Sequence, residues 1–399
     1  MSKNKAKTWL RPLWRICNQT AILIFEFLSR KSPLIYEKRA KELICYTCSY
    51  LSRLLDRFNE HIKGFSIDNK RVKKILVIRL DKIGDMVWTS PVFVNLRNHF
   101  PSANISVVAG SWTVPIIESN PYIDNVIKYD VWCYAPQGKK CTLFRDRLKI
   151  LRQLSKEQFD LILNLRTSIG FLFFGLLSSG VFIGKETREH GVRSSLSPLY
   201  KLGLKSLKEE LSLFLPNSAR IFAEEFLKNN GITNGDVLIA IHPGAGWVGR
   251  QWRPENFAVV ADELTKKYES NIVIFGSPDD IHLAQEIASK MKSKPIIAAG
   301  KTNLMQMSGI LRKCKLFIGH DTGPMHIAVA LKVPVVVLRG AADISDAHPW
   351  TSKDMYRIVS KDVSCWPCDE IICDNGYKCV QSITVDEVLS ASFSIMESK

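Results

Sequence analysis

Short apolar runs alternate with helical segments along most of this chain, and this alternation limits the fold more than any other feature. Apolar residues are continuous at 75–78, within the segment 74–80, and at 316–318, which is typical of strands buried on both faces of a parallel sheet. Repeated strand–helix units predict an α/β fold with parallel sheets. We expect strands at 74–80, 105–108, 126–129, 161–165, 181–183, 237–241, 272–275, 296–298, 316–318 and 333–338.

The predicted helices lie between these strands. We expect them at 87–100, 114–119, 143–157, 219–229, 254–268, 281–291, 304–312 and 324–331, with a polar, basic loop after residue 183. Because 399 residues are long for one hydrophobic core, we divide the chain into an extension at 1–72 and two Rossmann-like domains at 73–222 and 223–399. The cleft between two such domains is the expected site.

The positive charge is concentrated at the start of the chain. Residues 1–74 contain 17 Lys and Arg against 6 Asp and Glu, which is +11 of the whole chain's +16. Such a segment favours an anionic membrane surface or nucleic acid as its neighbour. Its most apolar piece, residues 21–25, is far shorter than the roughly 20 residues of a spanning helix, and no signal-peptide cleavage site follows it. An interfacial amphipathic helix and a helical hairpin packed on its own domain are both open; nucleic acid is disfavoured because no recognition module accompanies the charge.

Ten cysteines occur, six scattered and four clustered. Without a signal peptide the chain is expected in the cytoplasm, where free thiols are the simplest state. The cluster consists of Cys365, Cys368, Cys373 and Cys379, a C-x2-C-x4-C-x5-C pattern that could bind structural zinc. The spacing between its halves is short for a zinc ribbon, so packed thiols and disulfides stay open as well.

A turn and a helix start follow the apolar run at 316–318. The segment 320–326 supplies glycine, a hydroxyl and a proline suited to a first helical turn, where its missing N–H would be unpaired anyway. Free amides at a helix N-terminus bind anions such as a diphosphate. His326 could donate to a phosphate, although a single histidine in a helix is more often structural.

A second glycine-rich loop, at 242–246, has similar physics. Arg250 follows it and could neutralise a diphosphate, or could be a solvated surface residue. Two anion-binding loops suggest an activated, phosphate-bearing donor. Farther on, the carboxylates of the 276–280 loop could bind ribose hydroxyls or simply cap the next helix.

A third loop, 79–86, lies beyond the carboxyl end of the first strand, where open α/β sheets bind ligands. Asp85 could accept a proton from an attacking hydroxyl, and Gly84 lets the backbone come close to a substrate. The alternative is that Asp85 only caps the following helix.

The three loops together resemble the lipopolysaccharide heptosyltransferases of glycosyltransferase family 9, over residues 73 to about 392. The segments that carry the resemblance are Leu76-Val77-Ile78-Arg79-Leu80-Asp81-Lys82-Ile83-Gly84-Asp85, His242-Pro243-Gly244-Ala245-Gly246 with Arg250-Gln251-Trp252, and His320-Asp321-Thr322-Gly323-Pro324-Met325-His326. The resemblance implies a GT-B fold, with an acceptor domain at 73–222 and a nucleotide-sugar domain at 223–399. It also implies inverting transfer of heptose from a nucleotide-diphosphate donor, ADP-heptose, to a lipid A–Kdo type core, without a catalytic metal or cofactor.

Residue roles follow from the same resemblance. Asp85 would be the general base. Arg250 stands where the family commonly has lysine, so a planar guanidinium with several donors replaces a compact ammonium. The donor-binding residues would be Gly244, Ala245, Gly246, Arg250, Asp279, Asp321, Thr322, Gly323, Pro324 and His326. The acceptor side would comprise Arg79, Lys82, Gly84, Arg166, Arg188 and Arg193.

Three rival functions remain on the sequence alone. A transferase of the same fold could use another nucleotide sugar for capsule or O-antigen. A nicotinamide oxidoreductase is remote, because the loop at 79–86, after the first strand, lacks G-x-G-x-x-G. A non-catalytic scaffold would bind no nucleotide sugar. The expected location is the cytoplasmic face of the inner membrane, where anionic lipid would attract the basic extension.

Overall fold

The computed structural model describes residues 71–130, 150, 152–154, 156–165, 181–184, 189–246, 250–340, 347–365, 373 and 375–398. All of them belong to one compact unit of the chain. The predicted extension at 1–72 lies outside these residues except for its last two positions. Among the helices described, none is long and apolar enough to cross a membrane.

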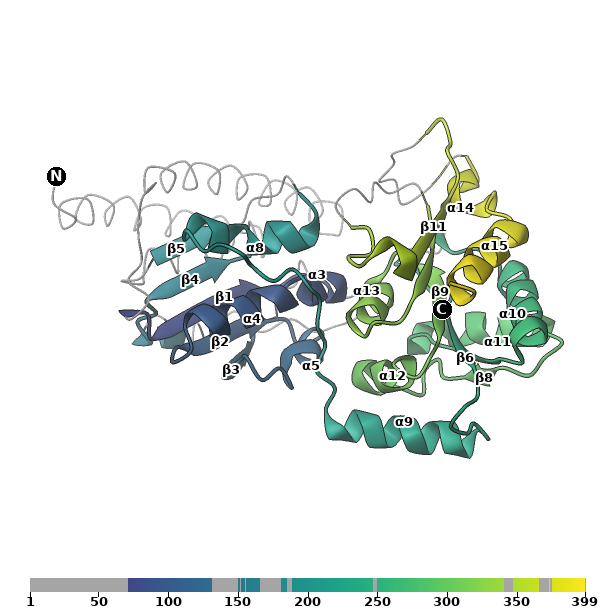
Figure 1. Cartoon of the computed structure of the whole chain (residues 1–399), viewed down its shortest axis with the longest axis horizontal. Coiled ribbons are helices and arrows are strands. Elements are labelled where there is room, and N and C mark those ends of the chain that lie inside the picture. Colours follow the sequence, from purple (N-terminus) through teal and green to yellow (C-terminus); the bar gives the residue numbers. More distant parts are fainter. Residues whose placement is uncertain are drawn as a thin grey trace, which may run out of the picture. The chain divides into compact units, whose positions relative to one another are not determined.

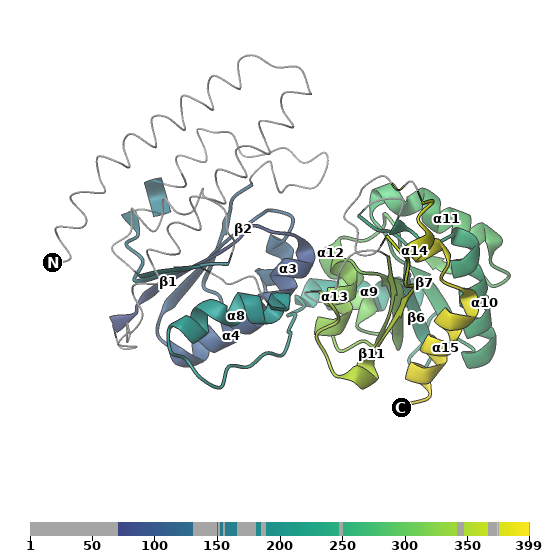
Figure 2. The same ribbon diagram turned by 90° about the horizontal axis from the view of Figure 1, so that it is seen from above.

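The N-terminal sheet contains five parallel strands in the order β3-β2-β1-β4-β5. The strands are β1 (Lys74–Arg79), β2 (Asn104–Ala109), β3 (Asn125–Lys128), β4 (Leu161–Asn164) and β5 (Val181–Gly184). The helices are α3 (Ile83–Trp88), α4 (Ser90–His99), α5 (Val114–Ile117) and α8 (Gly191–Lys201). Helices α4 and α8 lie side by side over one face of this sheet (Figure 2).

The C-terminal sheet contains six parallel strands in the order β11-β10-β9-β6-β7-β8. Its strands are β6 (Leu238–His242), β7 (Asn271–Ile274), β8 (Ile296–Ile297), β9 (Leu316–His320), β10 (Val335–Arg339) and β11 (Tyr356–Ser360). Its α-helices are α9 (Asn217–Asn229), α10 (Pro254–Tyr268), α11 (Ile281–Lys290), α12 (Leu304–Leu311), α13 (Gly323–Ala330), α14 (Lys378–Gln381) and α15 (Val385–Met396). Two short 3₁₀ helices, η4 (Pro278–Asp280) and η5 (Lys353–Met355), complete the part described.

Helices cover both faces of the C-terminal sheet (Figure 1). One face packs against α10, α11 and α15 through a buried cluster that includes Ile239, Ile241 and Phe257. The other face is covered by α12 and α13, with α9 packed on α12, and its cluster continues without a break into the core of the N-terminal sheet. This shared core fixes the loops of the two sheets relative to each other.

The α/β class and the ten strands predicted from the apolar runs are confirmed, whereas β11, α14 and α15 were not predicted. The prediction for the segment after residue 183 was wrong in part, because α8 forms where we expected a loop. The apolar positions of α8 are interrupted by serines and Pro198, yet Val192, Leu196 and Leu199 are fully buried. The predicted helix at 87–100 is two helices that meet at Thr89. Most of the predicted helix at 143–157 lies outside the described residues. Helix α9 runs across the predicted domain boundary at 222/223.

Candidate functional site

The first candidate loops leave the C-terminal sheet at one edge. Strand β6 pairs with β9 on one side and β7 on the other, and His242 of β6 lies beside Gly319 of β9. The chain reverses its strand order between β6 and β9, and such a switch point is where open α/β sheets bind ligands. The loops after β6, β7 and β9 therefore emerge next to one another.

The first of these neighbours are the 242–246 and 276–280 loops. A side chain at residue 244 would collide with Asp280, since a Cβ on Gly244 would lie 2.8 Å from the Asp280 Oδ1. Asp280 Oδ2 also accepts hydrogen bonds from the Ser277 N–H and hydroxyl at 2.8 and 2.7 Å, so this carboxylate caps η4. The residue that we assigned to the donor, Asp279, is exposed instead. The carboxylate facing the glycine loop is thus the next one along the chain.

Two histidines end β6 and β9 below these loops. Burial lowers the pKa of His320 from 6.5 to about 4, and it lowers that of His242 as well. His320 Nε2 accepts the backbone N–H of Trp252 at 3.1 Å, which ties the segment after Arg250 to the end of β9. Trp252 is buried and its indole donates to the Ile383 carbonyl at 2.9 Å, so it is a packing residue.

The loop after β9 begins the helix predicted at Pro324. Helix α13 starts one residue earlier, at Gly323, with Thr322 as its N-cap. A Cβ on Gly323 would lie 2.7 Å from the Ile83 Cγ2, so glycine permits the first turn of α13 to pack directly on α3. The amides of this turn and the loop that holds Asp85 are therefore neighbours in space.

Asp85 lies in the first turn of α3 with its side chain 27% exposed. Its Oδ1 accepts a 2.8 Å hydrogen bond from Arg79 Nη2, and its Oδ2 accepts the backbone N–H of Lys82 at 3.2 Å. The carboxylate is therefore also a helix cap, which was the alternative reading. A carboxylate has about four lone-pair positions, so these two bonds leave capacity for a hydroxyl.

Arg79 is completely buried at the end of β1. Its guanidinium contacts Asp85, reaches Asp81 Oδ2 at 3.3 Å, and donates to the Leu165 carbonyl at the end of β4. Burial lowers the pKa of Arg79, whereas the charge of Asp85 raises it. Because Arg79 has no exposed surface, its place is that of a support for Asp85, and not of a group that touches an acceptor directly.

His326 extends from α13 over the loop at 79–86. Its imidazole is almost fully buried, with Nε2 3.6 Å from the Asp321 Oδ1. A Cβ on Gly84 would lie 2.8 Å from the His326 Cδ2, so the ring rests against the residue that precedes Asp85. The indole N–H of Trp88, at the end of α3, donates to the His326 Nδ1 at 3.2 Å.

An aromatic cluster, which the sequence analysis missed, continues from Trp88. Its ring lies edge-on to His190 at 5.5 Å, and His190 stacks on Trp350 at 4.4 Å. His190 Nε2 lies 2.9 Å from the His348 carbonyl, and the Trp350 indole donates to the Glu209 carbonyl at the same distance. These partners are more than 100 residues apart in the chain, so no local pattern could have indicated them.

The remaining predicted residues lie as follows. Lys82 is exposed, and Arg193, half exposed, pairs with Glu209 at 3.5 Å and lies over the Trp350 ring. Arg250 precedes α10, with its Cγ 4.0 Å from the place of a Cβ on Gly340. Arg166 and Arg188 lie outside the described residues.

The cysteine cluster is described only in part, because Cys368 lies outside the described residues. Cys365, Cys373 and Cys379 form no disulfide, and Cys373 Sγ accepts the Tyr377 N–H at 3.4 Å. In the part of the chain that the structure covers, no group of three or more potential ligands is arranged around a metal position. Zinc at this end stays a prediction.

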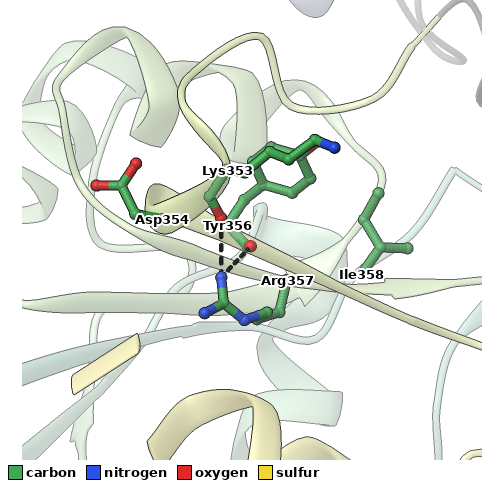
Figure 3. A pocket seen from close by; sticks show the side chains of 5 residues that line it. All are labelled: Lys353, Asp354, Tyr356, Arg357 and Ile358. Atoms are coloured by element: carbon green, nitrogen blue, oxygen red, sulfur yellow. Dashed lines mark hydrogen bonds between the residues drawn. The ribbon is translucent and has the colours of Figure 1, made fainter. Parts of the chain in front are cut away.

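A surface hollow of 540 Å³ lies elsewhere, at β11 and η5. Figure 3 shows the side chains that line it, with Arg357 donating to the carbonyls of Lys353 and Tyr356. None of its five lining residues was predicted for the site. The hollow is separate in sequence from every loop described above.

Comparison with known proteins points to one family of enzymes. The model of glycosyltransferase family 9 (heptosyltransferase) matches residues 196–378. The chain is 29% identical over 293 residues to lipopolysaccharide heptosyltransferase 3 of Escherichia coli, covering 67% of this chain and 84% of that one. It is 24% identical over 307 residues to the lipopolysaccharide core heptosyltransferase OpsX of Haemophilus influenzae, covering 71% and 83%.

Solved structures show the same architecture. A family 9 glycosyltransferase from Veillonella parvula superposes with a TM-score of 0.70 at 24% identity, covering 82% of this chain and 98% of that one. The ADP-heptose heptosyltransferase II of Escherichia coli gives 0.64 at 20% identity, covering 82% and 99%. These likenesses establish the GT-B fold of two Rossmann-like domains.

Proposed function

We propose that this chain is a heptosyltransferase of glycosyltransferase family 9, and that it moves a heptose from ADP-heptose to a lipopolysaccharide core of the lipid A–Kdo type. The observation that carries the proposal is the close approach of Gly84 and Asp85 to the first turn of α13, through His326 and Gly323. The carboxylate that we propose as the proton acceptor is therefore next to the loop that we propose for the diphosphate.

In the proposed step, an acceptor hydroxyl gives its proton to Asp85 while its oxygen bonds to the anomeric carbon. The bond from that carbon to the diphosphate oxygen breaks on the opposite side, so the configuration inverts and ADP departs. Backbone amides at 244–246 and 322–324, His326 and Arg250 would hold the negative charge of the leaving group. Arg79 keeps the Asp85 carboxylate oriented before the proton arrives.

The test is Asp85→Asn assayed by ADP release and by the anomeric configuration of the product. We expect turnover to fall by about 10²- to 10⁴-fold, the usual contribution of a positioned base, with ADP binding unchanged. Glu387→Gln is a matched control, because Glu387 occupies the same capping position in α15 and accepts the Thr384 N–H at 2.9 Å. Equal turnover in the two variants would mean that Asp85 only caps α3.

The donor is tested separately with a panel of nucleotide sugars. ADP-heptose should be turned over in preference to UDP- and GDP-sugars; preference for one of those would favour the capsule or O-antigen alternative. We also propose that transfer requires no metal, because the amides and Arg250 supply positive charge to the diphosphate. Activity after exhaustive chelation should therefore equal that of untreated enzyme.

Finally, we propose that the basic extension at 1–72 holds the enzyme at the anionic cytoplasmic face of the inner membrane. Replacing Lys3, Lys5, Lys7, Arg11 and Arg15 with glutamine should reduce sedimentation with anionic vesicles, and added salt should do the same to the unaltered chain. An equal number of substitutions at exposed lysines elsewhere is the control. Unchanged vesicle binding in the first variant would contradict the proposal.

A further inference from the structure

We propose that Trp88 is a positioning residue: it fixes the tautomer and orientation of His326, so that a residue of the N-terminal region completes the donor site of the C-terminal region. The inference rests on the proposed function for the use of that site, but its main readout does not depend on activity. It starts from one hydrogen bond between residues 238 positions apart.

The Trp88 ring is held tightly. It ends α3, the helix that also carries Asp85, and it packs edge-on against both His190 and His326. A Cβ on Gly191 would overlap the Trp88 ring, so glycine at the start of α8 leaves the space that the indole fills. An indole fixed on three sides can direct its N–H in only one direction.

That N–H determines where the proton of His326 lies. Tryptophan is a donor only, and a neutral imidazole has one donor and one acceptor nitrogen. Because Trp88 donates to Nδ1 at 3.2 Å, Nδ1 is the acceptor and the ring hydrogen is on Nε2. The imidazole is nearly inaccessible to solvent, with 4% of its side chain exposed, so water does not compete for Nδ1.

The Nε2–H then lies where a phosphate would accept it. Nε2 is 3.6 Å from the Asp321 Oδ1, at the start of the α13 turn, and 3.5 Å from the place of a Cβ on Gly84. The other tautomer would turn a lone pair toward Asp321 and toward any bound anion, which is repulsive. Trp88 therefore makes the His326 Nε2–H a donor toward the diphosphate.

The arrangement joins two functions on one helix. Asp85 and Trp88 are three residues apart on α3, so they move together with it. The Asp85 carboxylate is thus in place when the His326 Nε2–H is directed toward the leaving group. We expect this coupling to affect the chemical step more than donor binding, since the amides of α13 do not depend on Trp88.

The test is Trp88→Phe, which keeps an aromatic ring and removes the N–H. Long-range ¹⁵N NMR of histidine-labelled protein with ADP should show His326 protonated on Nε2 in the unaltered chain and a tautomer mixture in the variant. We expect kcat to fall about 3- to 10-fold, as for one neutral hydrogen bond, with the Kd for ADP changed by less than about 2-fold.

Trp350→Phe is the matched control, because it removes an indole N–H from the same aromatic cluster that donates to a carbonyl instead of His326. Its His326 tautomer and kcat should be those of the unaltered chain. An Nδ1-protonated His326 in the unaltered protein would overturn the inference, even if Trp88→Phe failed to fold. The two proposals can fail separately. If Asp85→Asn keeps its turnover while His326 of the unaltered chain is protonated on Nε2, the proposed base is refuted and the role of Trp88 stands.

Discussion

Removing the buried guanidinium of Arg79 should strongly destabilise the fold. Arg79 has no exposed surface, and it is the cation that two carboxylates share, Asp81 at 3.3 Å and Asp85 at 2.8 Å. Arg79→Met fills a similar volume but leaves both carboxylates and the Leu165 carbonyl without this partner. Breaking a buried pair in this way costs about 3–5 kcal/mol. Because Asp81 and Asp85 are 15% and 27% exposed and keep some hydration, we expect the lower end, about 3 kcal/mol.

Urea-induced unfolding followed by circular dichroism measures this loss. Arg97→Met is the control, since Arg97 also pairs with an aspartate and donates to carbonyls but is 21% exposed and its partner Asp124 is 39% exposed. It should cost about 1 kcal/mol, the upper end for an exposed pair. Adding Asp85→Asn to Arg79→Met should cost less than the sum of the two, because one repelling charge is gone. Equal losses for the Arg79 and Arg97 variants would refute the idea that Arg79 is the central support.

Other predictions concern stability. The pKa of His320 is about 4 because of burial, whereas the unfolded residue takes up a proton near 6.5, so the unfolded state binds more protons between these values. The free energy of unfolding that this residue contributes should fall by about 2 kcal/mol between pH 7 and pH 5. In urea titrations at the two pH values, His320→Asn should therefore lose about 2 kcal/mol less than the unaltered chain. An identical loss in the two proteins would contradict the assignment. In α12, a Cβ on Gly309 would collide with the Ala219 carbonyl of α9, so Gly309→Ala should cost about 1–3 kcal/mol despite the helix preference of alanine. A rise in its melting temperature would show that these helices do not pack so closely.

The strands were predictable because burial on both faces leaves a local mark. Residues such as Ile75 to Ile78 are all fully buried, so a continuous apolar run is enough to find β1. Helix 254–268 was predicted to the residue, since Pro254 opens it and its buried positions follow helical spacing. Where the mark is weaker the prediction failed: β11 has one buried residue in five, and it was missed together with α15, which packs on it.

The candidate site was predictable only where it consists of loops at strand ends. The position of each loop follows from the strand before it, and this placed 79–86, 242–246 and 320–326 at sheet edges. Which side chain of a loop turns inward is decided by distant contacts. Asp280 faces Gly244 because it caps η4 through Ser277, and Asp279, one residue earlier, faces solvent.

In the proposed mechanism, Asp85 combines the two functions that the sequence offered as alternatives. A carboxylate that only capped α3 would need the Lys82 N–H and nothing else, and it would not require a buried arginine on its other oxygen. A base without the cap would be free to rotate away from the attacking hydroxyl. The cap fixes the rotamer and Arg79 fixes the second oxygen, so the orientation is set before substrate arrives. The cap is therefore part of the catalytic proposal, which is why a capping control with the same geometry, Glu387, separates the two.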